Sequence, residues 1–271
     1  MTVSASQPDD SRLLGITCVM NSKWLRCLFK KQAPSVYLLC FPWAGGGASY
    51  YAAKWGKNFP DNIEVYGVCL AGRENRFSEP FCTDWKVLVV EICRDIHKDL
   101  ENKQFVLWGH SLGAGIAFET ARYLKKHYGL EPSHLLISGA AGPEVPRTSG
   151  GASQLSNEQL ADKIKHWGGT PQAILDNKDI MDISVRILRA DLTLLENYRF
   201  VPDNSDMVVL SCPITCFDGS ADLHHQEGWC QVTTGAYNRH VVSGGHFYFM
   251  NNPISEKSLL DLITSTVLQK P

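Results

Sequence analysis

The pentapeptide 109–113, Gly-His-Ser-Leu-Gly, limits the folds open to this chain more than any other feature. The apolar run 105–108 leads into it, and a helix-like stretch, 114–125, follows it. A G-x-S-x-G pattern between a strand and a helix exposes the serine hydroxyl at the carboxyl end of a sheet. The sequence therefore predicts an α/β fold in which Ser111 is a catalytic nucleophile; a purely structural turn is the alternative.

Apolar runs alternate with helix-like segments along the rest of the chain. The predicted strands are 36–41, 63–70, 105–108, 134–138, 214–217 and 239–242. The predicted helices are 49–58, 83–100, 112–125 and 255–267. Runs that are apolar on both faces suit parallel strands covered by helices on both sides. The expected architecture is a mainly parallel sheet flanked by helices.

Residues 143–204 interrupt this alternation, because no strand-like run occurs in them. Ser156 and Gln159 fit a capping box, which predicts a helix that begins there. A longer helix follows, with an apolar stripe at Ile180, Ile183, Ile187, Ala190 and Leu194. We expect a helical lid inserted between the fourth and fifth predicted strands. A helical subdomain that only enlarges the core is the alternative.

The length of 271 residues suits one large α/β domain. We expect a poorly ordered N-terminal segment at 1–27 and the folded α/β domain at 28–271, with the lid at 143–204 inside it. The formal net charge of −2 argues against a nucleic-acid partner. No apolar run approaches the ~18 residues of a membrane span, and the start lacks a signal-peptide pattern. The expected protein is a cytosolic monomer without a membrane partner.

The nine cysteines do not indicate a disulfide framework, because their number is odd and several lie in apolar runs. Cys212 and Cys216 are four residues apart, but no second pair has the spacing of a zinc site. We therefore expect no metal and a reducing compartment.

The catalytic base is expected to be a histidine late in the chain, because the triad order in such folds is Ser, acid, His. His246 follows the predicted strand 239–242 and the turn Ser243-Gly244-Gly245. The two glycines allow a close approach of the backbone to Ser111. His246 is the predicted base.

Two aspartates after the strand 214–217 compete as the acid. Asp218 lies so close to the strand end that a turn-capping role suits it better. Asp222 lies four residues further on and can reach the imidazole Nδ1–H, which it would hold in the correct tautomer. Asp191 is a third candidate, but its place within a helix of the lid favours packing. Asp222 is the predicted acid.

An oxyanion hole needs two backbone N–H donors. Leu112, the residue after the nucleophile, supplies one. The other is expected from the glycine-rich loop 42–47, Pro-Trp-Ala-Gly-Gly-Gly, with Ala44 or its neighbour as the donor. This loop lacks the Gly-Lys-Ser/Thr ending of a phosphate-binding loop, so a nucleotide site is not expected.

Taken together, these motifs resemble the type II thioesterases of the α/β-hydrolase superfamily, in particular those of vertebrate fatty acid synthesis. The matching stretches are 40–47, 70–76, 109–113, 189–192, 212–222 and 244–247. Ala71 departs from the proline usual in the family. Arg73 and Arg76 match a family motif, and we expect them to form ion pairs that tie the turn rather than to act in catalysis.

The resemblance implies a Ser111–His246–Asp222 triad that hydrolyses fatty acyl thioesters and releases free fatty acids of medium chain length. It implies as substrate an acyl group on the phosphopantetheine arm of an acyl carrier protein domain, in a fatty acid synthase or a polyketide synthase. The phosphopantetheine belongs to the substrate, so no cofactor is expected in this chain. An editing thioesterase, a lipase or carboxylesterase, and a non-catalytic hydrolase-fold binding module are the alternatives.

Overall fold

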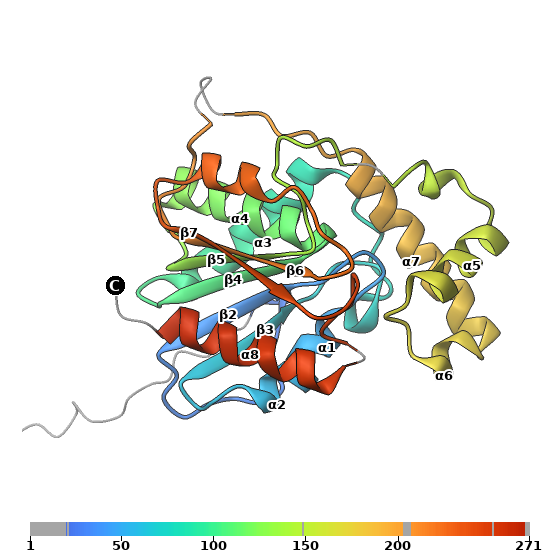
Figure 1. Ribbon diagram of the computed structural model, residues 1–271, viewed down its shortest axis with the longest axis horizontal. Helices are drawn as coiled ribbons and strands as arrows, with labels where there is room; N and C mark the ends of the chain where they lie inside the picture. The colour runs from blue at the N-terminus through green and yellow to red at the C-terminus, as the bar shows by residue number, and fades with distance from the viewer. Residues whose placement is uncertain (1–19, 21, 148, 203–206, 251, 269–271) are drawn as a thin grey trace, which may run out of the picture.

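The computed structural model describes residue 20 and residues 22–147, 149–202, 207–250 and 252–268. Its centre is a seven-stranded sheet in the order β1-β3-β2-β4-β5-β6-β7 (Figure 1). The strands are β1 (Leu25–Arg26), β2 (Val36–Phe41), β3 (Ile63–Val68), β4 (Phe105–His110), β5 (His134–Ser138), β6 (Ile214–Gly219) and β7 (Tyr237–Val242). Every neighbouring pair is parallel except β1 with β3. The α/β class and all six predicted strands are confirmed.

Helices cover both faces of the sheet (Figure 1). They are α1 (Ala48–Tyr50), the π-helical turn η1 (Tyr51–Trp55), α2 (Gly56–Asn58), α3 (Trp85–Leu100), α4 (Leu112–Tyr128) and α8 (Pro253–Leu268). Alternate side chains of β2 point to opposite faces of the sheet and pack in two different core layers. Leu39 and Phe41 belong to the core that contains α3 and α4, whereas Leu38 and Cys40 belong to the core of η1 and α8. The sheet is thus buried on both faces, as its continuous apolar runs predict.

The N-terminal edge of the sheet lies in the segment expected to be poorly ordered. Residues 1–19 and 21 fall outside the described residues, so that part of the expectation is not addressed. Leu25 and Arg26, however, pair with Val68 and Gly67 of β3, and the Trp24 side chain is buried. The expected boundary at residue 27 therefore falls inside the folded unit, because an edge strand of two residues is too short to give a periodic pattern.

A helical insertion separates β5 from β6, the fourth and fifth of the predicted strands. It contains the 3₁₀ turn η3 (Ala152–Gln154), α5 (Asn157–Trp167), α6 (Gln172–Leu175) and α7 (Lys178–Glu196). The predicted capping box is present at the start of α5, where Ser156 Oγ accepts from Gln159 N and the Gln159 side chain accepts from Ser156 N. We call α5, α6 and α7 the insertion; Figure 1 shows it at one end of the sheet.

The insertion has a small core of its own between α5 and α7. Its buried side chains are Ala152, Leu160, Ile164, Met181, Val185, Leu188 and Leu192. Most of the stripe predicted for α7 therefore lies on a different face, because Ile180 is 40% exposed and neither Ile183 nor Ile187 is fully buried. Of the five predicted residues only Leu194 is buried, and it belongs to the main core rather than to that of the insertion. The residues one position further along, among them Met181 and Leu188, fill the core instead. The helical spacing of the apolar residues in α7 is as predicted, but the face of α7 that packs in the core differs from the predicted one.

Two further expectations concern the cysteines and membrane-spanning helices. The eight described cysteines are free thiols, and Cys212 and Cys216 are both buried. Among the described helices, none combines the length and the apolar character that crossing a membrane requires.

Candidate active site

Ser111 occupies a strained turn between β4 and α4. Its φ of 56° and ψ of −115° lie in a region that non-glycine residues rarely adopt. The backbone is held there because Ser111 N donates to Ser138 O of β5 at 2.8 Å. Gly113 allows the helix to start so close to β2, since a Cβ at this position would lie 2.2 Å from Phe41 O. This is the geometry that presents a serine hydroxyl at the edge of a sheet.

His246 and Asp222 lie in contact on two neighbouring loops. His246 follows β7, Asp222 follows β6, and His246 Nδ1 lies 2.5 Å from Asp222 Oδ2. This hydrogen bond lowers the pKa of the Asp222 carboxyl, which is thereby kept ionised. With Nδ1 donating to the carboxylate, the neutral ring has its lone pair on Nε2, the nitrogen that a base would use.

Backbone contacts hold the two loops side by side. Ser220 N donates to Val242 O and Ala221 N donates to Gly244 O, both at 2.8 Å. Gly219 permits this approach, because a Cβ there would lie 2.2 Å from Gly245 O. The short distance between Asp222 and His246 is therefore set by the main chain as well as by the side chains.

The His246 ring lies beside the turn that carries Ser111. Its centre is 4.7 Å from that of His110, the residue before Ser111. A Cβ at Gly139, which follows Ser138 in β5, would lie 3.3 Å from the His246 ring. Within the described residues, Ser111 Oγ makes no hydrogen bond to His246. Hydrogen bonds between nucleophile and base are often long before substrate binds.

His110 is a buried neutral neighbour of the base. His110 Nδ1 lies 2.8 Å from Ser138 Oγ, which in turn lies 2.7 Å from the hydroxyl of Tyr248. Burial holds the pKa of His110 well below its usual range. The ring therefore packs against His246 without adding a positive charge.

Asp218, the alternative candidate for the catalytic acid, makes more contacts than the predicted turn cap would. It is fully buried and accepts hydrogen bonds from His224 N at 3.0 Å, Gln226 Nε2 at 3.0 Å and Arg239 Nη2 at 3.2 Å. These contacts fold the chain between β6 and the 3₁₀ helix η4 (Glu227–Val232), so its role extends well beyond a turn cap. Asp222, and not Asp218, is the carboxylate that contacts His246.

Two backbone amides near Ser111 are free to donate. Within the described residues, Ala44 N and Leu112 N make no hydrogen bond, and Leu112 is the first residue of α4, where amides lack helical partners. The next two amides of the loop are occupied, because Gly45 N donates to Asp191 Oδ2 at 2.7 Å and Gly46 N donates to Trp43 O at 2.9 Å. Ala44 N and Leu112 N thus remain the expected donors of an oxyanion hole.

A buried ion pair joins the glycine-rich loop to the insertion. Arg73 Nη1 and Nη2 donate to the two carboxylate oxygens of Asp191 at 2.7 and 2.6 Å, and Nη1 also donates to Gly46 O at 2.9 Å. Arg76 pairs instead with Glu79 at 2.6 Å. The expected ion pairs are present, but Asp191 lies 118 positions from Arg73, and no local pattern could have identified it as the partner.

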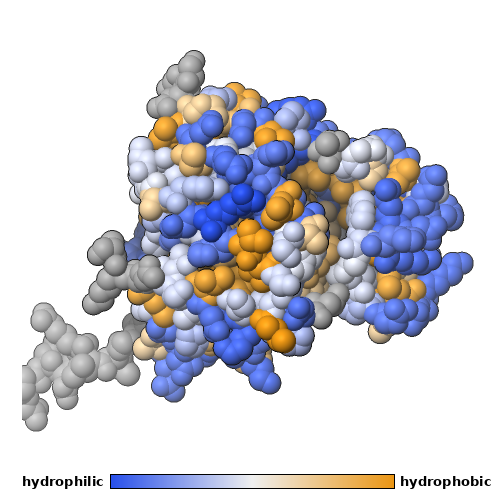
Figure 2. All heavy atoms as spheres, viewed as in Figure 1, coloured by the Kyte–Doolittle hydropathy of each residue, from blue (hydrophilic) through white to orange (hydrophobic). Residues whose placement is uncertain are grey.

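A cavity of about 280 Å³ lies between the loop 42–47 and the insertion. Its walls include Ala44 and Gly45 on one side, Leu188 and Trp167 of the insertion on the other, and Phe247 next to the predicted base. Figure 2 shows the surface hollowed where the insertion meets the body of the protein. An apolar chain bound in this cavity would have its end close to the free Ala44 amide.

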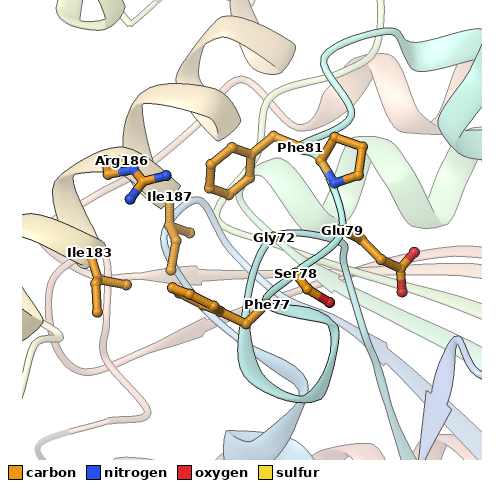
Figure 3. Close-up of a pocket in the computed structure, with 9 residues that line it drawn as sticks. Gly72, Phe77, Ser78, Glu79, Phe81, Ile183, Arg186 and Ile187 are labelled. Carbon is orange, nitrogen blue, oxygen red and sulfur yellow. The ribbon is translucent and has the colours of Figure 1, made fainter.

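A second cavity, of about 240 Å³, lies on another side of α7 (Figure 3). Ile183 and Ile187 of α7 face Phe77 and Phe81 of the segment after β3, and Arg186 lies at the same helix face. The predicted apolar stripe of α7 thus lines this groove in part. Cavities thus lie on two sides of α7, and the ion pair of Arg73 with Asp191 ties the helix to the body of the protein between them.

The side chains of Asp222, His224 and His246 place three oxygen and nitrogen atoms within 4.8 Å of one another. The 2.5 Å contact between His246 and Asp222 already uses two of these atoms. A cation there would have to displace the hydrogen bond between His246 and Asp222.

Three features of this structure are typical of the α/β-hydrolase fold. They are the mixed sheet of seven strands, the serine at a strained strand-to-helix turn, and the Asp and His that follow β6 and β7 and contact each other. A family model described as the thioesterase domain matches residues 37–265. The chain belongs to the thioesterase family and is thus a thioester hydrolase.

Similar proteins come from fatty acid and natural-product synthesis. The medium-chain S-acyl fatty acid synthase thioesterase of Rattus norvegicus is 37% identical over 237 residues, which cover 85% of this chain and 88% of the relative. The gramicidin S biosynthesis protein GrsT of Aneurinibacillus migulanus is 33% identical over 231 residues, or 84% and 88% of the two chains. The RedJ thioesterase of the prodiginine pathway in Streptomyces coelicolor superposes with a TM-score of 0.78 at 30% identity, covering 86% and 91%.

Proposed function

We propose that this thioesterase hydrolyses medium-chain fatty acyl thioesters carried by an acyl carrier protein, with Ser111, His246 and Asp222 as its catalytic triad. The observation that carries the proposal is the 2.5 Å contact of His246 with Asp222 beside the strained Ser111 turn. The relationship to fatty acid synthase thioesterases supports the substrate class.

The reaction proceeds in two acyl-transfer steps. His246 Nε2 takes the proton of Ser111 Oγ as the oxygen attacks the thioester carbonyl. The tetrahedral intermediate collapses, the C–S bond breaks, and His246 returns the proton to the departing thiolate. Water, deprotonated by His246, then attacks the acyl-serine carbonyl. The C–O bond to Ser111 breaks, His246 returns the proton to Ser111 Oγ, and the fatty acid is released. Asp222 holds the ring and stabilises its charged form throughout.

The oxyanion of each intermediate is stabilised by the amides of Ala44 and Leu112. Both amides make no hydrogen bond within the described structure; Ala44 lies on the loop after β2, and Leu112 directly follows Ser111 at the start of α4. Loss of one such donor typically lowers the rate by ~10²–10³-fold. Asp191 and Arg73 keep the Ala44 loop in place through Gly45 and Gly46.

The insertion acts as a lid over the acyl chain. The cavity between Leu188 and the loop 42–47 supports this role, because it adjoins both Ala44 and Phe247. The substrate's own phosphopantetheine thiol is the leaving group, so this chain needs no resident cofactor. We further propose that the carrier protein domain belongs to a fatty acid synthase or a polyketide synthase, and that the enzyme works as a cytosolic monomer.

Hydrolysis of decanoyl thioester on a carrier protein, compared with p-nitrophenyl decanoate, tests the substrate class. We expect the thioester to be the better substrate by kcat/KM. A large preference for the oxygen ester would identify a lipase or carboxylesterase instead. Fluorophosphonate labelling of wild type and Ser111→Ala addresses catalysis itself: an unlabelled wild type, or equal labelling of both, would identify a binding module.

A carrier-protein series from acetyl to stearoyl separates two roles of the same site. We expect the maximum between octanoyl and dodecanoyl, as product release from fatty acid synthesis requires. The relationship to a gramicidin S biosynthesis protein leaves an editing role as the alternative. A maximum at acetyl or propionyl would indicate such an editing enzyme.

A further inference from the structure

The loop that carries Asp222 also places a second histidine against the same carboxylate. His224 Nε2 lies 3.7 Å from Asp222 Oδ2, the oxygen that His246 Nδ1 contacts at 2.5 Å. The centres of the two imidazole rings are 5.8 Å apart. One carboxylate therefore has two histidines beside it, and the triad uses only one of them.

The other side of His224 is fixed by the buried Asp218. Asp218 Oδ2 accepts from the backbone N–H of His224, and Asp218 Oδ1 lies 3.0 Å from His224 Nδ1. An ionised carboxylate only accepts hydrogen bonds, so His224 Nδ1 must carry the proton of this contact. In the neutral ring the lone pair is then on Nε2, the nitrogen that faces Asp222.

A neutral His224 would therefore set a nitrogen lone pair against a carboxylate oxygen, with no hydrogen between them. Protonation removes this conflict, because Nε2–H then points toward Asp222 while Nδ1–H remains on Asp218. The hydrogen bond to Asp218 raises the pKa of His224, and the charge of Asp222 adds to that effect. The favoured form is an imidazolium between two carboxylates.

The other charged and titratable groups around His224 come from several elements. Arg239 of β7 donates to Asp218 at 3.2 Å and to His224 O at 3.4 Å. Arg147, in the segment after β5, opposes a positive charge on His224. His246 and the buried His110 are the remaining neighbours. Both direct contacts of the ring nitrogens are nevertheless with carboxylates, Asp218 and Asp222.

We propose that His224 is a positioning residue of the active site: as a cation between Asp218 and Asp222 it keeps Asp222 ionised and oriented, and it extends the activity of His246 to lower pH. This inference rests on the proposed triad. A positive charge about 6 Å from a second imidazole disfavours protonation of that imidazole. Because only neutral His246 can act as a base, the cation on His224 preserves the active form as the pH falls.

The test is the rate at which a fluorophosphonate labels Ser111, measured between about pH 5 and 9 in buffers that contain EDTA. The probe reports activation of the serine without requiring any particular thioester. The variants are His224→Gln, His224→Lys and the control His225→Gln. His225 is the exposed neighbour, so its substitution changes the same residue type one position away.

We expect His224→Gln to move the midpoint of the acid limb upward by about 0.5 to 1 pH unit. His224→Lys restores a cation and should return the midpoint toward that of the wild type, whereas His225→Gln should leave it in place. Equal midpoints in wild type and His224→Gln would overturn the inference, as would a Lys variant that behaves like the Gln variant.

The design also separates this inference from the proposed function. A wild-type protein that is not labelled at any pH would contradict the triad itself. Normal labelling with unshifted midpoints would contradict only the role of His224. Thermal unfolding of each variant at one pH shows whether it is folded, and a purely structural role of His224 would lower the melting temperature without moving the midpoint.

Discussion

Arg73 and Asp191 form a buried ion pair with two parallel hydrogen bonds, at 2.7 and 2.6 Å. Each side chain is about 95% shielded from solvent. The pair connects the segment after β3 to α7, and it grips the loop 42–47 through Gly45 N and Gly46 O. One contact thus links the insertion to the loop that carries the Ala44 amide.

Breaking this pair should affect both stability and catalysis. Asp191→Ala leaves the Arg73 guanidinium buried without its partner, so we expect a loss of about 3–5 kcal/mol in the free energy of unfolding. Urea titration measures this loss. The exposed pair of Lys165 with Asp162, at 3.1 Å, provides the control: Asp162→Asn should change stability by less than about 0.5 kcal/mol.

The double variant Arg73→Met/Asp191→Leu separates the two effects. Apolar replacement of a buried pair often restores stability, but it does not restore the contacts to Gly45 and Gly46. We expect kcat to remain about 10²-fold below that of the wild type in this folded variant. A double variant with wild-type kcat would show that the pair contributes only stability.

Asparagine substitutions distinguish the two aspartates after β6. Asp222→Asn should lower kcat by about 10⁴-fold, because the amide no longer orients the ring of His246 correctly. Asp218→Asn should instead destabilise the fold by about 3 kcal/mol, since the fully buried Asp218 carboxylate is the shared hydrogen-bond acceptor of His224, Gln226 and Arg239. Steady-state kinetics and urea titration of both variants check this contrast. The reverse pattern would make Asp218 the catalytic acid.

The lid cavity should determine which acyl chains fit. Ser184 of α7 lines it, and among the described residues its hydroxyl bonds only to Ile180 O of the same helix. Ser184→Phe should therefore fill the cavity and move the chain-length optimum toward shorter acyl groups, with Ser184→Thr as the matched control. The measurement is kcat/KM over a carrier-protein series. An unchanged optimum in the Phe variant would place the acyl chain elsewhere.

Stability should fall in mild acid, in part through His134. Its Nε2 lies 2.8 Å from Thr215 Oγ1, and burial lowers its pKa to about 4. The unfolded chain, with a pKa near 6.5, takes up this proton first. The contribution of His134 to the free energy of unfolding is therefore fully present above about pH 6.5 and is lost as the pH falls toward 4. The total loss is about 3 kcal/mol.

Urea titrations at about pH 7.5 and 4.5 test this effect. His134→Gln should be less stable than the wild type at the higher pH but should lose less on acidification. The control, His127→Gln, removes an exposed histidine and should lose as much as the wild type. Equal losses in wild type and His134→Gln would show that His134 does not contribute.

The parts of the site that follow strands could be predicted from the sequence. Ser111, Asp222 and His246 each come shortly after an apolar run, and the carboxyl ends of parallel strands meet at one edge of the sheet. Glycines beside these runs, such as Gly245, indicated where the backbone approaches closely. The expected order of serine, acid and histidine came from the fold class that the G-x-S-x-G pattern indicates.

What could not be predicted depends on contacts between distant segments. The partner of Arg73 lies on α7, and the buried face of α7 is rotated from its predicted stripe because α5 packs against Met181 and Leu188. Asp218 appeared to be a turn cap because its partner Arg239 belongs to the next strand. The edge strand β1 has two residues, too few for any periodic signal.

The most direct test of the triad is to trap the acyl-enzyme. Decanoyl-carrier protein is mixed with the enzyme, quenched with acid within a single turnover, and digested for mass spectrometry. We predict a decanoyl adduct on Ser111, absent from Ser111→Ala, together with loss of fatty acid release in that variant. Undiminished release by Ser111→Ala, or an adduct on another residue, would contradict the account.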